Sequence, residues 1–299
     1  MTVESTVDRG LVGSGVGDAP FSRVCAVTEL ASESAEIGRY AGIIESIWTI
    51  GPKLHGGTMV AGSAAAAVAW LRRTAPERAA MFPIAASSDF LGAPDPGEVE
   101  YEVRTRKLGR QICLVDVGLI QGGRTLVHTA FTFSHLDDIE PVYAPDKSEG
   151  MPAAPSADAL AYDDDNPMGK IVHVAQGSEV ALDGTSAPFL TGGQGEPELR
   201  LWIRPFAADE ADADVFAFFA MMAADMSPPV PMNRGHFGWA PTVQLTTYLR
   251  RRPTPGWLRI IASAKEIGGR MFDEDQLVLD ATGAIVAQSR QLALIPQNP

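Results

Sequence analysis

The most regular feature of the sequence is an alternation of apolar and polar residues. Segments such as "QICLVDVGLIQ" and "TLVHTAFTFS" place an apolar residue at nearly every second position. This pattern predicts β-strands that bury one face and expose the other. Short turns containing Gly separate these segments, so we expect neighbouring strands to pair antiparallel as a meander.

Two segments break the alternation and are apolar on almost every side. Residues 58–73 lie within "GGTMVAGSAAAAVAWLRR" and consist mostly of alanine, and residues 215–226 read "VFAFFAMMAADM". A helix that is apolar all round is a buried helix. Alanine side chains also make the first one thin, and a sheet packs only about 10 Å from what it covers. We therefore expect two central helices, each enclosed by a sheet.

The order of elements occurs twice along the chain. A Pro-Gly turn leads into an alternating strand that ends on Gly-Arg at residues 96–110 and again at 255–270. A strand and a helix precede each of these segments, and further strands follow. The expected fold class is α+β, a double hot-dog, in which two fused repeats each wrap a long antiparallel sheet around a central helix. We expect a flexible N-terminus at 1–20, a first repeat at 21–136, a Pro-rich linker at 137–162 and a second repeat at 163–299.

Composition narrows the classes of partner. The formal net charge of −13 over 299 residues argues against nucleic acid. The longest apolar run is well short of the roughly 20 residues that span a bilayer, so we expect no membrane span. Two cysteines are too few for a disulfide framework or a cysteine metal site, which favours a cytoplasmic protein without a metal or redox cofactor. The acidic clusters at 163–165 and 209–214 are interpreted as solvated loops rather than metal ligands.

Specific motifs connect this architecture with a known family. The first half contains "HGGTMVAG", "SSDFLGAPDPGEVEYEV" and "LGR", and the second contains "WLRII" and "GGRMFDEDQLVLDATGAIVAQSRQLAL". With these motifs the chain resembles the acyl-CoA thioesterase II type of the thioesterase-like superfamily over residues 35–135 and 165–296. The resemblance implies an enzyme of fatty acid and lipid metabolism that hydrolyses an acyl-CoA thioester to a free acid and CoA, without a cofactor.

The resemblance also implies a catalytic group in the second repeat. The family positions and polarises a water molecule with an Asp, a hydroxyl residue and a Gln, and the matching positions here are Asp225, Thr242 and Gln291. An Asp near the end of an apolar helix should have a raised proton affinity and serve as a base, while Thr and Gln orient the water. The family often has an Asp two residues after the hydroxyl, where this chain has Gln244. Taken alone, Asp225 could be a helix-end polar residue and Thr242 a strand-edge hydroxyl.

The two repeats differ at these positions. The repeat alignment pairs Gln291 with Phe131, and the first helix offers only the Trp70–Arg73 region, without a carboxylate, where the second has Asp225. We therefore expect one active site per chain.

Gly56 and Gly57, at the start of the first helix, are candidate substrate-binding residues. Free N–H groups at a helix N-terminus can polarise a carbonyl, and glycine lets a thioester approach the backbone closely. In related hot-dog enzymes the helix start of one repeat faces the acid of the other, which would place Gly57 opposite Asp225. His55 joins them as a candidate, although a loop or capping role is the more common one for such a residue, and a tight strand-to-helix turn would explain the glycines.

Two other functions remain open from the sequence. The first is an acyl-CoA-binding or sensing protein on the same fold that does not hydrolyse its ligand. The second is an enoyl-CoA hydratase, because "YDDDNPMGKIVH" is similar to the D-x-N-P-x-H motif of hot-dog hydratases at Asp164, Asn166 and Pro167, although Gly169 stands where the motif has His. The outer sheet faces of fused hot-dogs are often covered by further copies, so we expect a homo-oligomer, a dimer or larger.

Overall fold

One large antiparallel sheet dominates the structure. The computed structural model describes residues 18–32, 34–148, 150–163 and 165–296. Within these residues thirteen strands form a single sheet in the order β1-β2-β6-β7-β8-β5-β12-β15-β14-β13-β11-β10-β9. A separate two-stranded hairpin, β3-β4, lies before the first central helix.

The elements of the first half are α1 (Pro20–Cys25), β1 (Thr28–Leu30), β2 (Ile37–Ile44), β3 (Thr49–Ile50), β4 (Lys53–Leu54), α2 (Gly56–Thr74), β5 (Phe82–Phe90), β6 (Gly97–Leu108), β7 (Cys113–Gln121) and β8 (Arg124–Ser134). Those of the second half are β9 (Leu160–Ala161), β10 (Ser178–Leu182), β11 (Glu198–Pro205), α3 (Ala207–Glu210), α4 (Ala213–Ala223), β12 (Thr242–Leu249), β13 (Leu258–Ser263), β14 (Met271–Leu279) and β15 (Ile285–Leu294). Short 3₁₀ helices lie in the connections: η1 (Ser46–Trp48), η2 (Pro76–Arg78), η3 (His173–Gln176), η4 (Gly184–Ser186), η5 (Pro188–Thr191) and η6 (Val230–Arg234).

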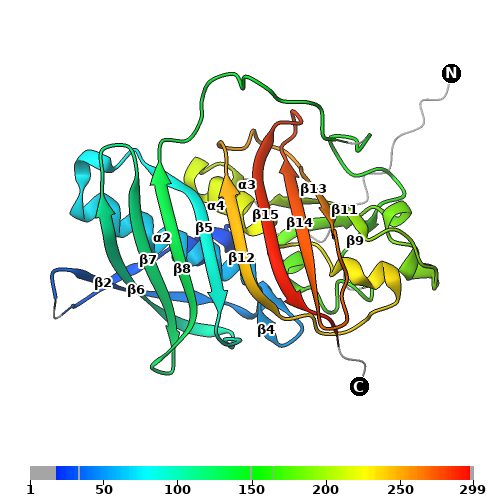
Figure 1. Ribbon diagram of the computed structural model, residues 1–299, viewed down its shortest axis with the longest axis horizontal. Coiled ribbons are helices and arrows are strands. Elements are labelled where there is room, and N and C mark those ends of the chain that lie inside the picture. The colour runs from blue at the N-terminus through cyan, green and yellow to red at the C-terminus, as the bar shows by residue number, and fades with distance from the viewer. Residues whose placement is uncertain (1–17, 33, 149, 164, 297–299) are drawn as a thin grey trace.

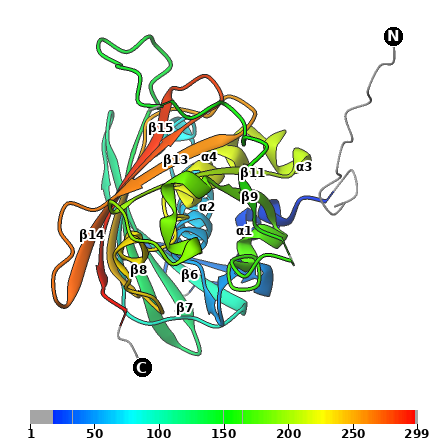
Figure 2. The same cartoon turned by 90° about the vertical axis from the view of Figure 1, so that its right-hand side faces the viewer.

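The two halves of the sheet join where β5 pairs with β12. Ser87 lies opposite Thr246 at this seam, and the antiparallel ladder continues without a break from one half to the other. Figure 1 shows the strands of the two halves side by side, with the helices behind them, and Figure 2 shows the sheet curving around α2 and α4. The expected double hot-dog is confirmed.

Helix α2 is enclosed as the sequence predicts. His55 is its N-cap residue, and the helix ends at Thr74, just before Pro76. Fourteen of its nineteen residues are buried, including the run Ala64–Val68. The small side chains let other backbone approach closely, because a Cβ atom added at Gly57 would lie 2.4 Å from the carbonyl oxygen of Met222.

Helix α4 runs antiparallel to α2. The start of α2 lies against Met222 near the end of α4, while Arg72 near the end of α2 forms an ion pair with Asp214 at the start of α4. Asp212 caps α4 by accepting hydrogen bonds from the N–H groups of Asp214 and Val215. The helix ends at Ala223, earlier than the expected Met226, so Asp225 lies beyond the helix rather than on it.

Two expected boundaries need correction. Residues 1–17 of the expected flexible N-terminus lie outside the described residues, and Pro20 already belongs to α1. The expected linker at 137–162 is irregular for most of its length and passes over one end of the sheet in Figure 1. Its last residues, Leu160 and Ala161, form β9, because they pair with Leu182 and Ala181 of β10.

Candidate active site

Asp225 is a buried carboxylate that lies at the N-terminus of α2. Its side chain is 7% exposed, and its Oδ2 accepts a hydrogen bond of 2.7 Å from the N–H of Gly57. The positive end of the α2 dipole therefore faces this carboxylate. Its other oxygen, Oδ1, accepts no hydrogen bond from the described residues. Asp225 thus has one oxygen fixed by the backbone and one without a hydrogen-bond donor among the described residues.

Both glycines make room for this carboxylate. A Cβ atom at Gly56 would lie 2.5 Å from Oδ2 of Asp225, and one at Gly57 would lie 3.0 Å from the Cβ of Asp225. The Gly-Gly pair is therefore required by the approach of Asp225 as well as by the entry into the helix. The N–H of Gly57 is occupied by Asp225, whereas that of Gly56 has no acceptor among the described residues.

His55 connects the start of α2 with the residues that follow α4. Its Nδ1 accepts a hydrogen bond from the N–H of Thr58 at 3.3 Å, which makes it the N-cap residue. Its Nε2 lies 2.9 Å from the carbonyl oxygen of Asp225. An imidazole that accepts at Nδ1 and donates from Nε2 satisfies both contacts. Both ring nitrogens are engaged and the residue is buried, so His55 holds the two segments together.

Thr242 and Gln291 form a second polar pair on neighbouring strands. The hydroxyl of Thr242, at the start of β12, donates a hydrogen bond of 2.7 Å to Oε1 of Gln291 in β15. This bond fixes the orientation of the amide and leaves its NH₂ group without an acceptor among the described residues. The pair therefore offers a hydrogen-bond donor in a buried position, because Gln291 is 7% exposed.

Two residues near this pair relate it to Asp225, although no hydrogen bond joins Asp225 to Thr242 or Gln291 among the described residues. Ser289, on the same face of β15 as Gln291, donates a hydrogen bond to the carbonyl oxygen of Ala224, next to Asp225. Glu274 of β14 lies directly opposite Gln291 in the ladder, and the negative charge of Asp225 contributes to a raised pKa of Glu274. Ser289 and Glu274 therefore link the strands around Gln291 with the turn that carries Asp225.

The electrostatics of this region are unusual. Burial raises the pKa of Asp225 above its ordinary value, and His55 and the Gly57 N–H oppose that effect. Burial, together with the negative charge of Asp225, raises the pKa of Glu274 to about 8, although the Val230 N–H opposes the rise. A carboxyl group with a pKa of about 8 keeps its proton at neutral pH, so Glu274 is neutral there.

Comparison with known proteins identifies the family. Residues 44–134 match the acyl-CoA thioesterase N-terminal domain, and residues 145–295 match the acyl-CoA thioesterase C-terminal domain. The chain belongs to the acyl-CoA thioesterase family. Uncharacterized proteins of Mycobacterium tuberculosis and Mycobacterium bovis are 38% identical to it over 277 residues, which cover 86% of this chain and 91% of each relative.

Solved structures agree with this acyl-CoA thioesterase fold. A proposed thioesterase II from Thermobifida fusca YX is 27% identical, with a TM-score of 0.78 over 94% of this chain and 99% of that one. An acyl-CoA thioesterase II from Mycobacterium marinum is 17% identical, with a TM-score of 0.65 over 93% of this chain and 98% of that one, and shows the fold alone.

The departure from the family pattern at Gln244 lies away from this region. Its amide donates hydrogen bonds to Ser87 on β5 and Thr246 on β12. Ser87 is exposed, and the next residue of β12, Leu245, faces the interior. Gln244 therefore belongs to the outer face of the sheet and does not contact Asp225 or Gln291.

Sequence reasoning missed Glu274 and Ser289. A signal for Glu274 was available, because the alternation in "MFDEDQLVL" assigns Phe272, Glu274 and Gln276 to the same face, and that face is buried. A Glu and a Gln at positions where an apolar residue is expected indicate a polar site. Ser289 gave no such signal, because its partner, the Ala224 carbonyl, is brought near only by the fold.

The acidic cluster at 209–214 was predicted wrongly as a solvated loop. Asp209 is fully buried and accepts hydrogen bonds from the N–H groups of Phe21 and Ser22 at the start of α1. Asp212 caps α4, and Asp214 pairs with two arginines. Among the described residues no three His, Cys, Asp or Glu side chains are grouped as metal ligands would be. No helix in the described part of the chain is long and apolar enough to cross a membrane.

Proposed function

We propose that this protein hydrolyses acyl-CoA thioesters to the free acid and CoA by direct attack of water. The observation that carries the proposal is the buried Asp225, with one oxygen fixed by the Gly57 N–H and the other open. Both halves of the chain match acyl-CoA thioesterase domains, which supports an acyl-CoA thioester as the substrate. Free thiols at Cys25 and Cys113 are consistent with a cytoplasmic location.

In this mechanism Asp225 is the general base. A water molecule donates a hydrogen bond to Oδ1 of Asp225 and accepts one from the Gln291 amide, whose orientation the Thr242 hydroxyl fixes. The water oxygen attacks the thioester carbonyl carbon while its proton passes to Asp225. The tetrahedral intermediate then expels the CoA sulfur, which takes the proton from Asp225. No covalent enzyme intermediate is needed, because the positioned water reacts directly.

The two glycines have different roles in the proposal. The N–H of Gly57 holds the carboxylate, so it does not polarise the carbonyl as the sequence suggested. The N–H of Gly56 has no acceptor among the described residues and lies at the positive end of α2, which suits it to stabilise the developing oxyanion. His55 supports this arrangement as the cap rather than as a residue that binds substrate.

The experiment is the release of free CoA from a panel of acyl-CoAs of increasing chain length, followed with a thiol reagent. We expect the wild type to release CoA and D225N and Q291A each to lower kcat by about 10²-fold or more. As a matched control, Q244A removes a neighbouring amide on the outer face and should leave kcat unchanged. Near-normal rates in both D225N and Q291A would overturn the assignment.

The same panel decides between this proposal and its alternatives. A wild type that binds acyl-CoAs but releases no CoA would be a binding or sensing protein. That reading rested on Gln244, which lies away from Asp225. A hydratase would hydrate a 2-enoyl-CoA instead, but Asn166 and Pro167 lie in an irregular segment before η3 rather than at the start of a central helix, and Asp164 lies outside the described residues.

A further inference from the structure

Glu274 is a fully buried carboxyl group for which the proposed hydrolysis has no use. Its Oε2 accepts a hydrogen bond of 3.0 Å from the N–H of Val230, and its Oε1 lies 2.9 Å from the amide nitrogen of Gln276. No Arg, Lys or His of the described residues forms an ion pair with it. Burying a carboxyl group without a cation lowers the stability of the fold. Glu274 therefore calls for a role other than stabilising the fold.

The matching position in the first half is apolar. Glu274 of β14 lies opposite Gln291 of β15, just as Val115 of β7 lies opposite Phe131 of β8. Strands β15 and β8 in turn pair with the two strands of the seam, β12 and β5. The sheet therefore accepts a valine at this place without any polar partner. A carboxyl group is thus present at this position only in the half that carries Asp225.

The contact with Val230 explains where this addition acts. Residues 224–241, which we call the Asp225 segment, connect α4 with β12, whereas residues 75–81 make the matching connection from α2 to β5. The Asp225 segment is long and irregular apart from η6. Glu274 fixes it at Val230, five residues beyond Asp225.

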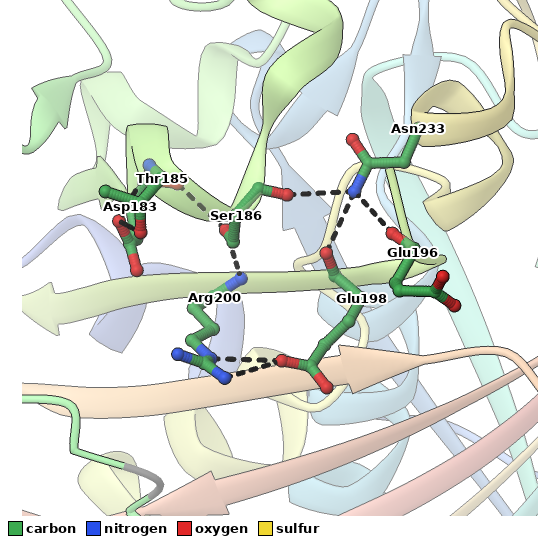
Figure 3. A network of polar contacts seen from close by, with 7 residues as sticks. All are labelled: Asp183, Thr185, Ser186, Glu196, Glu198, Arg200 and Asn233. Carbon is green, nitrogen blue, oxygen red and sulfur yellow. Dashed lines mark hydrogen bonds and ion pairs between the residues drawn. The ribbon is translucent and has the colours of Figure 1, made fainter. Parts of the chain in front are cut away.

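Asn233 fixes the same segment further from Asp225. Its side-chain amide donates hydrogen bonds to the carbonyl oxygens of Ser186, Glu196 and Glu198, as Figure 3 shows. Asn233 is 1% exposed, but its three bonds are only partly buried, whereas those of Glu274 are fully buried. The two anchors differ in that Asn233 is always neutral and Glu274 can ionise.

Among the charged groups around Glu274, Asp225 is the one that affects its ionisation. The turn after α4 contributes Asp225, and His55 at the start of α2 contacts Asp225 rather than Glu274. On β14 and β15 the side chains of Asp275 and Arg290 pair with each other on the outer face, and Asp273 accepts bonds from backbone N–H groups there. Arg234 of η6 donates to the carbonyl oxygen of Gly195. Asp225 is thus the charge that Glu274 meets inside the sheet.

We propose that Glu274 is a positioning residue whose neutral carboxyl group anchors the Asp225 segment and leaves Asp225 as the only anionic carboxylate of the site. This inference rests on the proposed hydrolysis. Negative charge develops on the thioester oxygen in the transition state, so a second anion nearby would raise the barrier. Ionisation of Glu274 also opposes the ionised form of Asp225, because like charges in a dry site repel.

The test compares the pH dependence of kcat in the wild type, E274Q and E274V. Because burial raises the pKa of Glu274 to about 8, the wild-type rate should fall as pH rises through that value. E274Q keeps an acceptor for the Val230 N–H, so it should keep kcat within about threefold at pH 7 and lose the alkaline fall. E274V, which copies Val115, should lower kcat about tenfold or more at every pH, with little change in KM, because the anchor is lost.

N233A is the matched control for a loosened segment. It should lower kcat without moving the midpoint of the alkaline fall, because Asn233 carries no charge. An alkaline fall that E274Q leaves in place, or that N233A moves, would overturn the charge part of the inference. A kcat of E274V equal to that of the wild type at pH 7 would overturn the anchoring part, and if E274V does not fold, the pH profile of E274Q decides alone.

A measurement without substrate separates this inference from the proposed function. If the wild type releases no CoA from any acyl-CoA, the hydrolysis fails, but Glu274 is still tested by thermal unfolding between pH 5 and pH 9. A carboxyl group whose pKa is higher in the folded state stabilises the fold at low pH and loses that contribution as pH rises through the folded value. The Tm of the wild type should therefore fall relative to that of E274Q by several degrees. A constant difference in Tm would overturn the inference.

Discussion

The two ends of the helix pair formed by α2 and α4 are built from the same elements but differ in how their charges match the helix dipoles. At one end the start of α2 faces Asp225, which also lies just beyond the C-terminus of α4, where a negative charge is unfavourable. At the other end Arg72 of α2 and Arg252 after β12 both pair with Asp214 in the first turn of α4. Every charge there suits its helix end.

The sheet positions above the two ends differ in the same way. Glu274, Gln276 and Gln291 correspond in ladder register to Val115, Val117 and Phe131. All six are nearly inaccessible to solvent, so the difference is one of chemistry and not of burial. The end with Asp214, which we call the compensated end because each charge there suits its helix dipole, contributes stability. The end with Asp225 keeps polar groups and a carboxylate that the fold alone does not need. The comparison therefore separates residues that serve a reaction from residues that serve the fold.

Exchanging the residues at positions 291 and 131 should produce the largest effects. Q291F removes the amide that Thr242 orients and should lower kcat by about 10²-fold or more. F131Q buries an amide without a partner at the other end and should lower the free energy of unfolding by about 3 kcal/mol while kcat stays unchanged. CoA release and urea unfolding measure the two quantities, and a loss of activity in F131Q equal to that in Q291F would contradict the division between the ends.

G57A tests the close approach at the active end. The added Cβ would lie 2.4 Å from the Met222 carbonyl oxygen, so the backbone must shift, at a cost of about 1–3 kcal/mol in unfolding free energy. The same shift displaces the N–H that holds Asp225, and we expect kcat to fall about tenfold or more. A69G on the same helix is the control, because it should cost about 1 kcal/mol of stability without changing kcat.

D214N tests the compensated end and should have a smaller effect. Burial alone would raise the pKa of Asp214, but hydrogen bonds from Arg72 and Arg252 hold it below its ordinary value. A lowered pKa stabilises the folded state at neutral pH, and this contribution is lost as pH falls through the folded value. D214N should therefore be about 1 kcal/mol less stable than the wild type at pH 7 and nearly equal to it at acid pH, with unchanged CoA release. A difference that grows towards acid pH would contradict this.

The smallest effect concerns two hydroxyl pairs that occupy matching positions. In the first half Ser88 and Thr129 bond to each other at 2.9 Å, whereas in the second half Ser289 bonds to the Ala224 carbonyl and leaves the Thr247 hydroxyl without a partner. T247V should be neutral or stabilising by up to about 1 kcal/mol, and S88A should be destabilising by about 1 kcal/mol. Urea unfolding gives both changes in unfolding free energy. If T247V were destabilising like S88A, Thr247 and Ser289 would still form a hydrogen bond, which would contradict the prediction.

The sequence predicts most of the fold because its patterns are local. Alternation defines the strands, alanine content defines α2, and the repeated Pro-Gly turns define the two halves. It also predicts Gly57, Asp225, Thr242 and Gln291 as candidates, but their catalytic roles stay a prediction. What the sequence does not predict depends on contacts between distant residues. The Gly57 N–H is taken by a carboxylate 168 residues away, so its role changes from polarising a carbonyl to holding a base.

The helix boundary at Ala223 illustrates the same limit. Apolar periodicity favours a helix through Met226, yet the chain turns earlier and brings Asp225 to the opposite helix. The reason is electrostatic and tertiary, because the start of α2 offers the carboxylate a free N–H and a favourable dipole, and the end of α4 offers neither. The apolar periodicity of the sequence therefore does not predict the end of α4 at Ala223.

The enclosure of α2 has a consequence for how quickly the two partners of the Gly57–Asp225 hydrogen bond become accessible to water. Amide protons in the buried middle of α2, from Val60 to Val68, should exchange with solvent only when the surrounding sheet opens, so their exchange should follow global unfolding. Amides of the Asp225 segment, outside any strand and anchored at a few points, should exchange through smaller local openings. One side of the site is thus as rigid as the whole fold, and the other side can respond on its own.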